Sequence, residues 1–321
     1  PLYFAMMEAQ HTIGAVPSDS AQVTRVRPWP PGFVLLLAVA AMSWAGPLVR
    51  FAAASALAIA AWRLIFSVVL IGAILVVRGQ GAALRTLSGR EWRLALASGA
   101  LLAAHFWSWI ASLELTTVAS SVVLVSTQPV FVAAFAALFL RERASRRQWA
   151  GILVAVVGAA VVGWGDGRIG GREGIDGAAF LGDLLAIAGA VFAAGYYVIG
   201  RSLRQRLDLW VYVGVVYGVA AGLLALAATA SPSIQLFGHP RGDWWIFLAL
   251  AAGPMMIGHT GVNYALRYLP AHVANLAVLG EPVGATLIAW LLPGIGETPT
   301  PQVLAGGALI GAGVVLGARE E

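Results

Sequence analysis

Long apolar runs separated by short polar breaks follow one another along the chain from about residue 32 to residue 317. A helix of about 20 predominantly apolar residues crosses the hydrocarbon core of a bilayer. Because most runs have about this length, the pattern predicts ten transmembrane helices, of which the fifth is short and weakest. The predicted spans are Phe33–Arg50, Ser55–Val77, Trp92–Leu113, Val118–Leu140, Trp149–Val162, Phe180–Arg201, Leu209–Ala228, Trp244–Leu266, His272–Leu292 and Pro301–Gly317.

The composition agrees with a membrane protein and excludes several other classes. Of the 321 residues, 60% are apolar and 11% are charged, whereas a soluble domain is about 25% charged. This balance excludes a soluble enzyme, a nucleic-acid-binding protein and a disordered scaffold, and it predicts an all-α integral membrane protein. The chain has no cysteine for a disulfide or thiolate metal site, and no lysine for a Walker A motif. We therefore expect no catalytic residues, no metal site and no cofactor.

The arginines predict the orientation of the chain in the membrane. With the N-terminus in the cytoplasm, fifteen arginines fall in cytoplasmic segments and four in outer segments. Basic residues are enriched in the cytoplasmic loops of membrane proteins, so both termini are predicted to be cytoplasmic. The lysine-free composition, rich in Ala, Arg and Gly, is typical of a GC-rich bacterial genome. We therefore expect the protein in a bacterial cytoplasmic (inner) membrane.

The two halves of the chain resemble each other. The segment Gly99–His105 aligns with Gly253–His259, and Gln128–Pro129 then meets Glu281–Pro282. Because each half holds an odd number of helices, the second half enters the membrane from the opposite side. The pattern therefore predicts two inverted five-helix repeats around a central cavity. The predicted domains are a cytoplasmic N-terminal segment (1–31), the first repeat (32–163), a Gly-rich extracytoplasmic loop (164–179) and the second repeat (180–318).

Polar residues near the middle of the predicted spans are candidates for transport, because polar groups in hydrocarbon need a partner or a water-filled cavity. His105 and Trp109 share one face of the third span, and His259 and Asn263 share one face of the eighth. At about 1.5 Å per residue, both histidines lie roughly 20 Å from the membrane surface. We expect them to line the cavity; the alternative is that they bond to neighbouring helices.

Four charged or amide residues are further candidates for contact with a substrate, and two of them, Glu281 and Arg63, have more than one interpretation. Glu281 can bind a substrate amino group, exchange a proton, or satisfy backbone carbonyls freed by Pro282. Gln128 and Asn275 can donate hydrogen bonds to a substrate carboxylate. Arg63 can attract such a carboxylate as well, but a structural arginine paired with a carbonyl or an acid is the favoured interpretation.

Aromatic residues are numerous in the spans that would surround the cavity. Their flat faces and polar tips suit an amphipathic or aromatic solute. Trp44, Trp109, Tyr196 and Tyr197 are the aromatic residues that we expect to contribute to the cavity wall.

The proline-containing fourth and ninth spans are each followed by a helix-ending glutamate, Glu142 or Glu297, and then by a Gly-rich helix. Together with Arg63 and Glu281–Pro282, this pattern resembles the drug/metabolite transporter superfamily, and within it the ten-helix EamA branch. The aromatic content resembles that of bacterial aromatic amino acid exporters.

The resemblance implies a secondary transporter that exports amino acids across the inner membrane by alternating access. Its partners would be a small-molecule substrate and the lipid bilayer, not nucleic acid, and it would act as a monomer or homodimer. Export of cationic drugs or of other small metabolites is the alternative. A membrane enzyme is less consistent with the sequence, because no acid, base or metal cluster lies at one membrane face. A channel is less consistent because inverted repeats around a closed cavity favour alternating access over an open pore.

Overall fold

The computed structural model describes residues 29–115, 121, 124–167, 177–292 and 301–318, and these residues contain helices and loops but no strand. The first half contains α2 (Pro31–Met42), α3 (Ala45–Phe51), α4 (Ala56–Val77), the 3₁₀ helix η1 (Gly81–Thr86), α5 (Gly89–Leu115), α7 (Gln128–Phe135), the π-helix η2 (Ala136–Leu140) and α8 (Arg146–Gly167). The second half contains α9 (Gly177–Arg204), α10 (Leu209–Ala230), α11 (Arg241–Leu250), the π-helix η3 (Ala251–His259), α12 (Thr260–Ala265), α13 (Ala271–Val278), α14 (Glu281–Leu291) and α15 (Pro301–Ala318).

These helices occupy the ten predicted segments. Among the described residues, six helical stretches are long and apolar enough to cross a membrane: Pro31–Phe51, Ala56–Val77, Gly89–Leu115, Phe180–Arg204, Leu209–Ala230 and Arg241–Ala265. Gln128–Leu140 and Leu304–Gly317 are shorter apolar helices. The prediction of an all-helical membrane fold is therefore confirmed.

Several predicted spans are broken or change helix type, and the breaks lie close to prolines. Pro129 and Pro282 stand in the first turn of α7 and α14, and Pro254 lies inside the π-helix η3. Proline has no N–H for the helical ladder and disfavours helical geometry in the residue before it. The ninth span therefore consists of α13 and α14 separated at Leu279 and Gly280.

The fifth helix is longer than the predicted Trp149–Val162. Helix α8 has 22 residues and reaches Gly167, and α9 begins at Gly177, so both extend into the segment predicted as a loop. A capping box starts α8: the Ser145 N–H donates to Gln148 Oε1 at 2.8 Å, and the Gln148 N–H donates to Ser145 Oγ at 3.2 Å. The cap stabilises the first turn of α8, before Trp149, which the apolar run alone does not predict.

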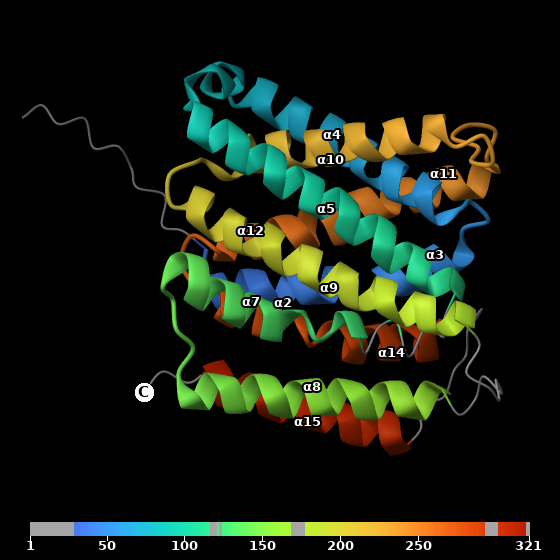
Figure 1. Cartoon of the computed structure of the whole chain (residues 1–321). Coiled ribbons are helices and arrows are strands. Elements are labelled where there is room, and N and C mark those ends of the chain that lie inside the picture. Colours follow the sequence, from blue (N-terminus) through green and yellow to red (C-terminus); the bar gives the residue numbers. More distant parts are fainter. Residues whose placement is uncertain (1–28, 116–120, 122–123, 168–176, 293–300, 319–321) are drawn as a thin grey trace, which may run out of the picture. The chain divides into compact units, whose positions relative to one another are not determined.

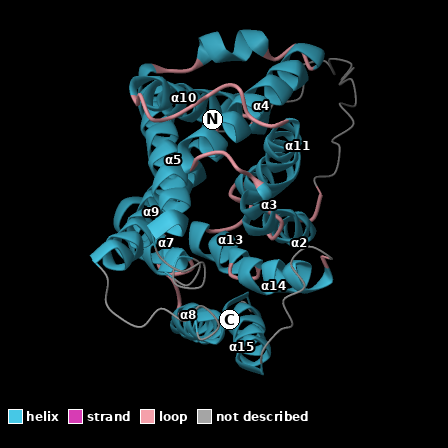
Figure 2. Ribbon diagram, turned by 90° about the vertical axis from the view of Figure 1, so that its right-hand side faces the viewer, coloured by secondary structure: helices cyan, strands magenta, loops and turns pink. Residues whose placement is uncertain are grey.

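The two halves interleave, so that the core lies between them. Helix α5 packs along α9, α4 packs along α10, and α2 packs against η3 and α12 (Figures 1 and 2). The most extensive helix contacts each join one helix of the first half to one of the second, whereas contacts within a half, such as that of α4 with α5, are smaller. A space between the halves is consequently lined from both.

Helices α8 and α15, the last of each half, lie side by side in both views. Glycine allows their backbones to approach closely. A Cβ atom added at Gly313 would lie 2.6 Å from both the Gly151 carbonyl oxygen and the Ala155 nitrogen, and neither backbone atom can move independently. Gly311 on the same helix has no such neighbour within 4 Å.

We expect Gly313→Ala to destabilise the protein by about 1–3 kcal/mol, because it overpacks the contact between α8 and α15. Gly311→Ala is the matched control, and it should be neutral or slightly stabilising because alanine favours helix more than glycine. Thermal unfolding in detergent compares the two variants. Equal melting temperatures would contradict the close contact.

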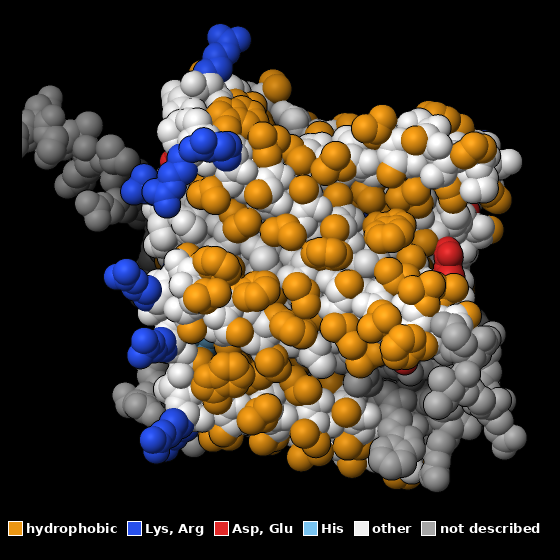
Figure 3. Space-filling model, viewed as in Figure 1, with side chains coloured by type: hydrophobic (Ala, Val, Ile, Leu, Met, Phe, Trp, Pro, Cys, Tyr) orange, Lys and Arg blue, Asp and Glu red, His pale blue; other side chains and the backbone are white. Residues whose placement is uncertain are grey.

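The surface divides into a charged end and an apolar belt. Arginine side chains gather at one end of the helices, which we call the arginine-rich end, and apolar side chains cover much of the visible face (Figure 3). Exposed apolar residues include Val76, Val77, Leu138 and Leu226. A belt of this kind is suited to contact with lipid chains.

Candidate functional site

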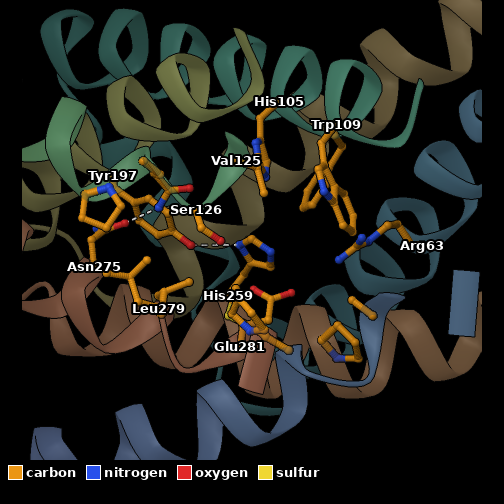
Figure 4. A pocket seen from close by; sticks show the side chains of 18 residues that line it. Arg63, His105, Trp109, Val125, Ser126, Tyr197, His259, Asn275, Leu279 and Glu281 are labelled. Carbon is orange, nitrogen blue, oxygen red and sulfur yellow. Dashed lines mark hydrogen bonds between the residues drawn. The ribbon is translucent and has the colours of Figure 1, made fainter. Parts of the chain in front are cut away.

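A central pocket of about 70 Å³ lies between the two halves (Figure 4). Helices α2, α3, α4, α5 and α7 of the first half and α9, η3, α13 and α14 of the second half contribute to its wall. Its polar lining residues are Arg63, His105, Ser126, Gln128, Tyr197, His259, Asn275 and Glu281. Phe106 and Trp109 supply aromatic surface, and the remaining lining residues are apolar.

Seven of the ten site residues predicted from the sequence line this pocket: His105, Trp109, Gln128, Tyr197, His259, Asn275 and Glu281. The other three do not. Tyr196 and Asn263 are buried outside the lining, where the Asn263 amide donates a hydrogen bond to the Tyr196 hydroxyl and another to the His259 carbonyl at 2.7 Å. Trp44 is 43% exposed at the break between α2 and α3.

The two histidines meet in the pocket, with ring centroids 6.4 Å apart. His105 Nδ1 lies 2.9 Å from the Gly189 carbonyl oxygen, which only accepts, so Nδ1 carries the proton. In the neutral ring Nε2 is then an acceptor. His259 Nδ1 pairs with the Tyr197 hydroxyl at 3.1 Å. Both rings are thus oriented by α9, which supplies Gly189 and Tyr197.

The amides of Gln128 and Asn275 bond to each other across the pocket wall. Gln128 Nε2 donates to Asn275 Oδ1, and Asn275 Nδ2 donates to the Ala271 carbonyl at 3.1 Å. This pair joins α7 of the first half to α13 of the second. Gln128 and Asn275 were expected to bind a substrate, but some of their hydrogen-bonding groups instead join the two halves.

Glu281 begins α14 directly before Pro282, and its side chain reaches the pocket from that helix end. The Glu281 backbone carbonyl accepts a 3.4 Å bond from Ser43 Oγ. The Glu281 carboxyl group makes no hydrogen bond to any described residue, whereas the structural interpretation required its protonated, neutral form to donate one to a freed backbone carbonyl. Its oxygens face the interior of the pocket (Figure 4).

Arg63 is a pocket residue for which sequence reasoning favoured a different role. Its side chain is 1% exposed, and Nε and both terminal nitrogens have no hydrogen-bond partner among the described residues. The guanidinium carbon lies 4.2 Å from the centroid of the Phe106 ring. The sequence did contain a signal for this role: Arg63 is a charged residue within a predicted span, and such residues usually mark functional sites.

The arginine-rich end of the molecule is closed by a polar cluster that joins the halves. Arg201 Nε donates to Glu142 Oε1 at 2.7 Å, and the Ala271 N–H donates to Glu142 Oε2 at 3.2 Å. His272 Nε2 and Gln148 Oε1 are 3.0 Å apart beside this ion pair. Glu142 and Gln148 belong to the first half, whereas their partners belong to the second.

Toward the opposite end, a second pocket of about 270 Å³ lies next to the central one. It is lined by residues of the α2–α4 and α5 segments, among them Arg50 and Glu114. Trp109 lines both pockets and is 7% exposed. Its indole therefore stands between the central pocket and this outer pocket.

Apolar helices of membrane-spanning length, interleaved halves and a polar central pocket define a multi-pass membrane transporter. The EamA-like transporter family matches residues 31–164 and 180–318, and the chain belongs to that family of the drug/metabolite transporter superfamily. The two matches coincide with the two halves.

Individual relatives agree with a transporter. A "probable terminal-alkyne amino-acid exporter" of Streptantibioticus cattleyicolor is 30% identical over 60% of this chain and 61% of that protein. An "uncharacterized transporter" of Archaeoglobus fulgidus is 25% identical over 66% of this chain and 72% of its own length. A solved crystal structure shares the fold with a TM-score of 0.73 and 20% identity, over 89% of this chain and 96% of that one.

Proposed function

We propose that the protein exports amino acids with apolar or aromatic side chains, using the central pocket in an alternating-access cycle. The observation that carries this proposal is the composition of the pocket: an acid, hydrogen-bonding imidazoles and aromatic walls lie together between the two halves. These groups complement a zwitterion that has an apolar side chain. The Streptantibioticus relative is described as an exporter of an amino acid, which agrees with this substrate class.

Alternating access is supported by the different closures on the two sides of the pocket. The ion pair between Glu142 and Arg201 seals the arginine-rich end, and Trp109 separates the pocket from its outer neighbour. A volume of about 70 Å³ is below the roughly 300–1,000 Å³ typical of ligand sites. The described conformation is therefore a contracted one that must widen to admit an amino acid.

Cationic drugs are the second candidate class, because the Glu281 carboxylate is unpaired and aromatic surfaces attract organic cations. Counterflow separates the candidates. Proteoliposomes loaded with unlabelled phenylalanine should accumulate labelled phenylalanine, leucine and tryptophan, and a lipophilic cation such as tetraphenylphosphonium should neither accumulate nor compete. Accumulation of the cation without that of any amino acid would overturn the proposal.

We further propose that the arginine-rich end faces the cytoplasm. Single cysteines can be placed on a chain that has none, at exposed positions on opposite ends: Ser233 between α10 and α11, and Ala82 in η1. A membrane-impermeant maleimide added to intact cells should label Ser233→Cys but label Ala82→Cys only after the cells are opened. The reverse labelling would contradict this orientation.

A further inference from the structure

The guanidinium of Arg63 is a charged group of the central pocket that has no hydrogen-bond partner among the described residues. It is fully buried by α4, α5 and their neighbours, yet none of its nitrogens makes a hydrogen bond there. Phe106 covers one face of the guanidinium plane at 4.2 Å. A cation over a ring face is stabilised electrostatically, but that contact leaves the N–H groups in the plane unused.

Leaving buried charged donors without hydrogen bonds costs free energy, so a buried arginine in this state indicates a role beyond packing. Figure 4 shows the guanidinium extending from α4 into the space between Trp109 and the Glu281 side chain. A fork of parallel N–H donors matches the two oxygens of a carboxylate. The free edge of Arg63 is thus a site for an anionic group of a ligand.

The fixed charges around Arg63 restrict which anion can bind. Glu281 faces the same pocket, and no hydrogen bond joins its carboxyl group to the Arg63 nitrogens. A ligand with several negative charges would be repelled by Glu281, since the pocket lining holds no second arginine. A ligand with one carboxylate and one ammonium matches both charges, and His105 Nε2 is a further acceptor for the ammonium.

We propose that Arg63 binds the carboxylate of the transported amino acid and that Glu281 and His105 receive its ammonium group. This inference rests on the proposed function, since it assigns the ends of the zwitterion within the same pocket. Arg63 then determines specificity: it selects molecules with a free carboxylate, while the aromatic wall selects the side chain.

The test compares three ligands as competitors of labelled phenylalanine on the purified protein. Phenylalaninamide keeps the ammonium and the ring but has no carboxylate, and phenethylamine lacks the carboxyl group altogether; unlabelled phenylalanine is the reference. We expect both amines to bind about 10- to 100-fold more weakly than phenylalanine, the range expected from losing a hydrogen-bonded charge. Arg63→Lys, which keeps the charge without the fork, should lose most of this discrimination while its melting temperature stays close to that of the native protein.

Equal binding of all three ligands to the native protein would overturn the assignment of Arg63 while leaving amino acid export in place. Unchanged discrimination in a folded Arg63→Lys protein would overturn it as well. If none of the three ligands bound, the proposed function would fail together with this inference. The comparison within the native protein does not depend on whether the variant folds.

Discussion

Glu281→Gln is expected to destabilise the folded protein by about 1–3 kcal/mol, because it leaves the buried Arg63 guanidinium without a compensating charge. Within the described pocket lining, Glu281 is the acidic residue, and the Arg63 nitrogens have no hydrogen bonds that would replace its effect. Glutamine keeps the size and polarity of the side chain. The loss therefore reports on charge and not on packing.

The double variant Arg63→Met with Glu281→Gln is the matched control. With both charges removed, the double variant should unfold at a higher temperature than Glu281→Gln alone. The double variant should then lose less stability than the sum of the two single losses, and this difference is the coupling energy between Arg63 and Glu281. Thermal unfolding of the four proteins in the same detergent measures this coupling. If the stability losses of the two single variants simply added, Glu281 and Arg63 would act independently, and Glu281 would not serve to compensate the charge of Arg63.

Trp109→Ala should weaken transport of phenylalanine and tryptophan by about 2- to 12-fold, with a smaller effect on threonine. The estimate follows from stacking between aromatic groups, which contributes about 0.5–1.5 kcal/mol beyond buried area. Trp109 lines the central pocket, and its indole N–H has no hydrogen-bond partner among the described residues, so the side chain can contact a substrate once the pocket widens. Initial rates of uptake into proteoliposomes, measured for each amino acid, give the ratio.

Trp107→Ala is the control for Trp109→Ala, because Trp107 lies on the same helix but is 45% exposed and outside the pocket. Its replacement should leave the ratio of phenylalanine to threonine transport unchanged. An equal loss for all substrates in Trp109→Ala would point to a packing role for the indole. The melting temperature of each variant shows whether the protein remains folded.

The positions of the helices could be predicted from the sequence because apolar runs of bilayer length leave few alternatives. The breaks could not be predicted from run length, since the runs continue through Pro129, Pro254 and Pro282. The prolines were visible, but whether a proline kinks, breaks or widens a helix depends on how neighbouring helices satisfy the freed carbonyls. The cap that lengthens α8 likewise depends on two polar side chains and not on the apolar pattern.

Within the site, the repeat was informative for residues at equivalent positions. His105 and His259 align between the halves, and the structure brings their rings together. Trp44 was chosen as an aromatic residue of the first predicted span, but the chain turns between α2 and α3, and Trp44 is exposed at this break instead of lining the pocket. Tyr196 neighbours Tyr197 in sequence, but successive helical residues point in different directions, and only Tyr197 reaches the pocket.

The role of Arg63 could not be decided from the sequence, because it depends on partners contributed by other helices. An acid or a carbonyl close to its nitrogens would have made it structural. The structure instead has Phe106 on one face of the guanidinium and, among the described residues, no hydrogen-bond partner at its N–H edge. Only the packing of α4 against α5 and the approach of α14 determine this arrangement.

The most direct test of a substrate site in the central pocket is a crystal structure with 4-bromophenylalanine bound, in which anomalous scattering locates the bromine. The proposed arrangement predicts a bromine peak beside Trp109 and carboxylate density at the guanidinium of Arg63, in a pocket wider than the contracted one. A ligand bound reproducibly outside the pocket, or one in the pocket with its carboxylate directed away from Arg63, would contradict it.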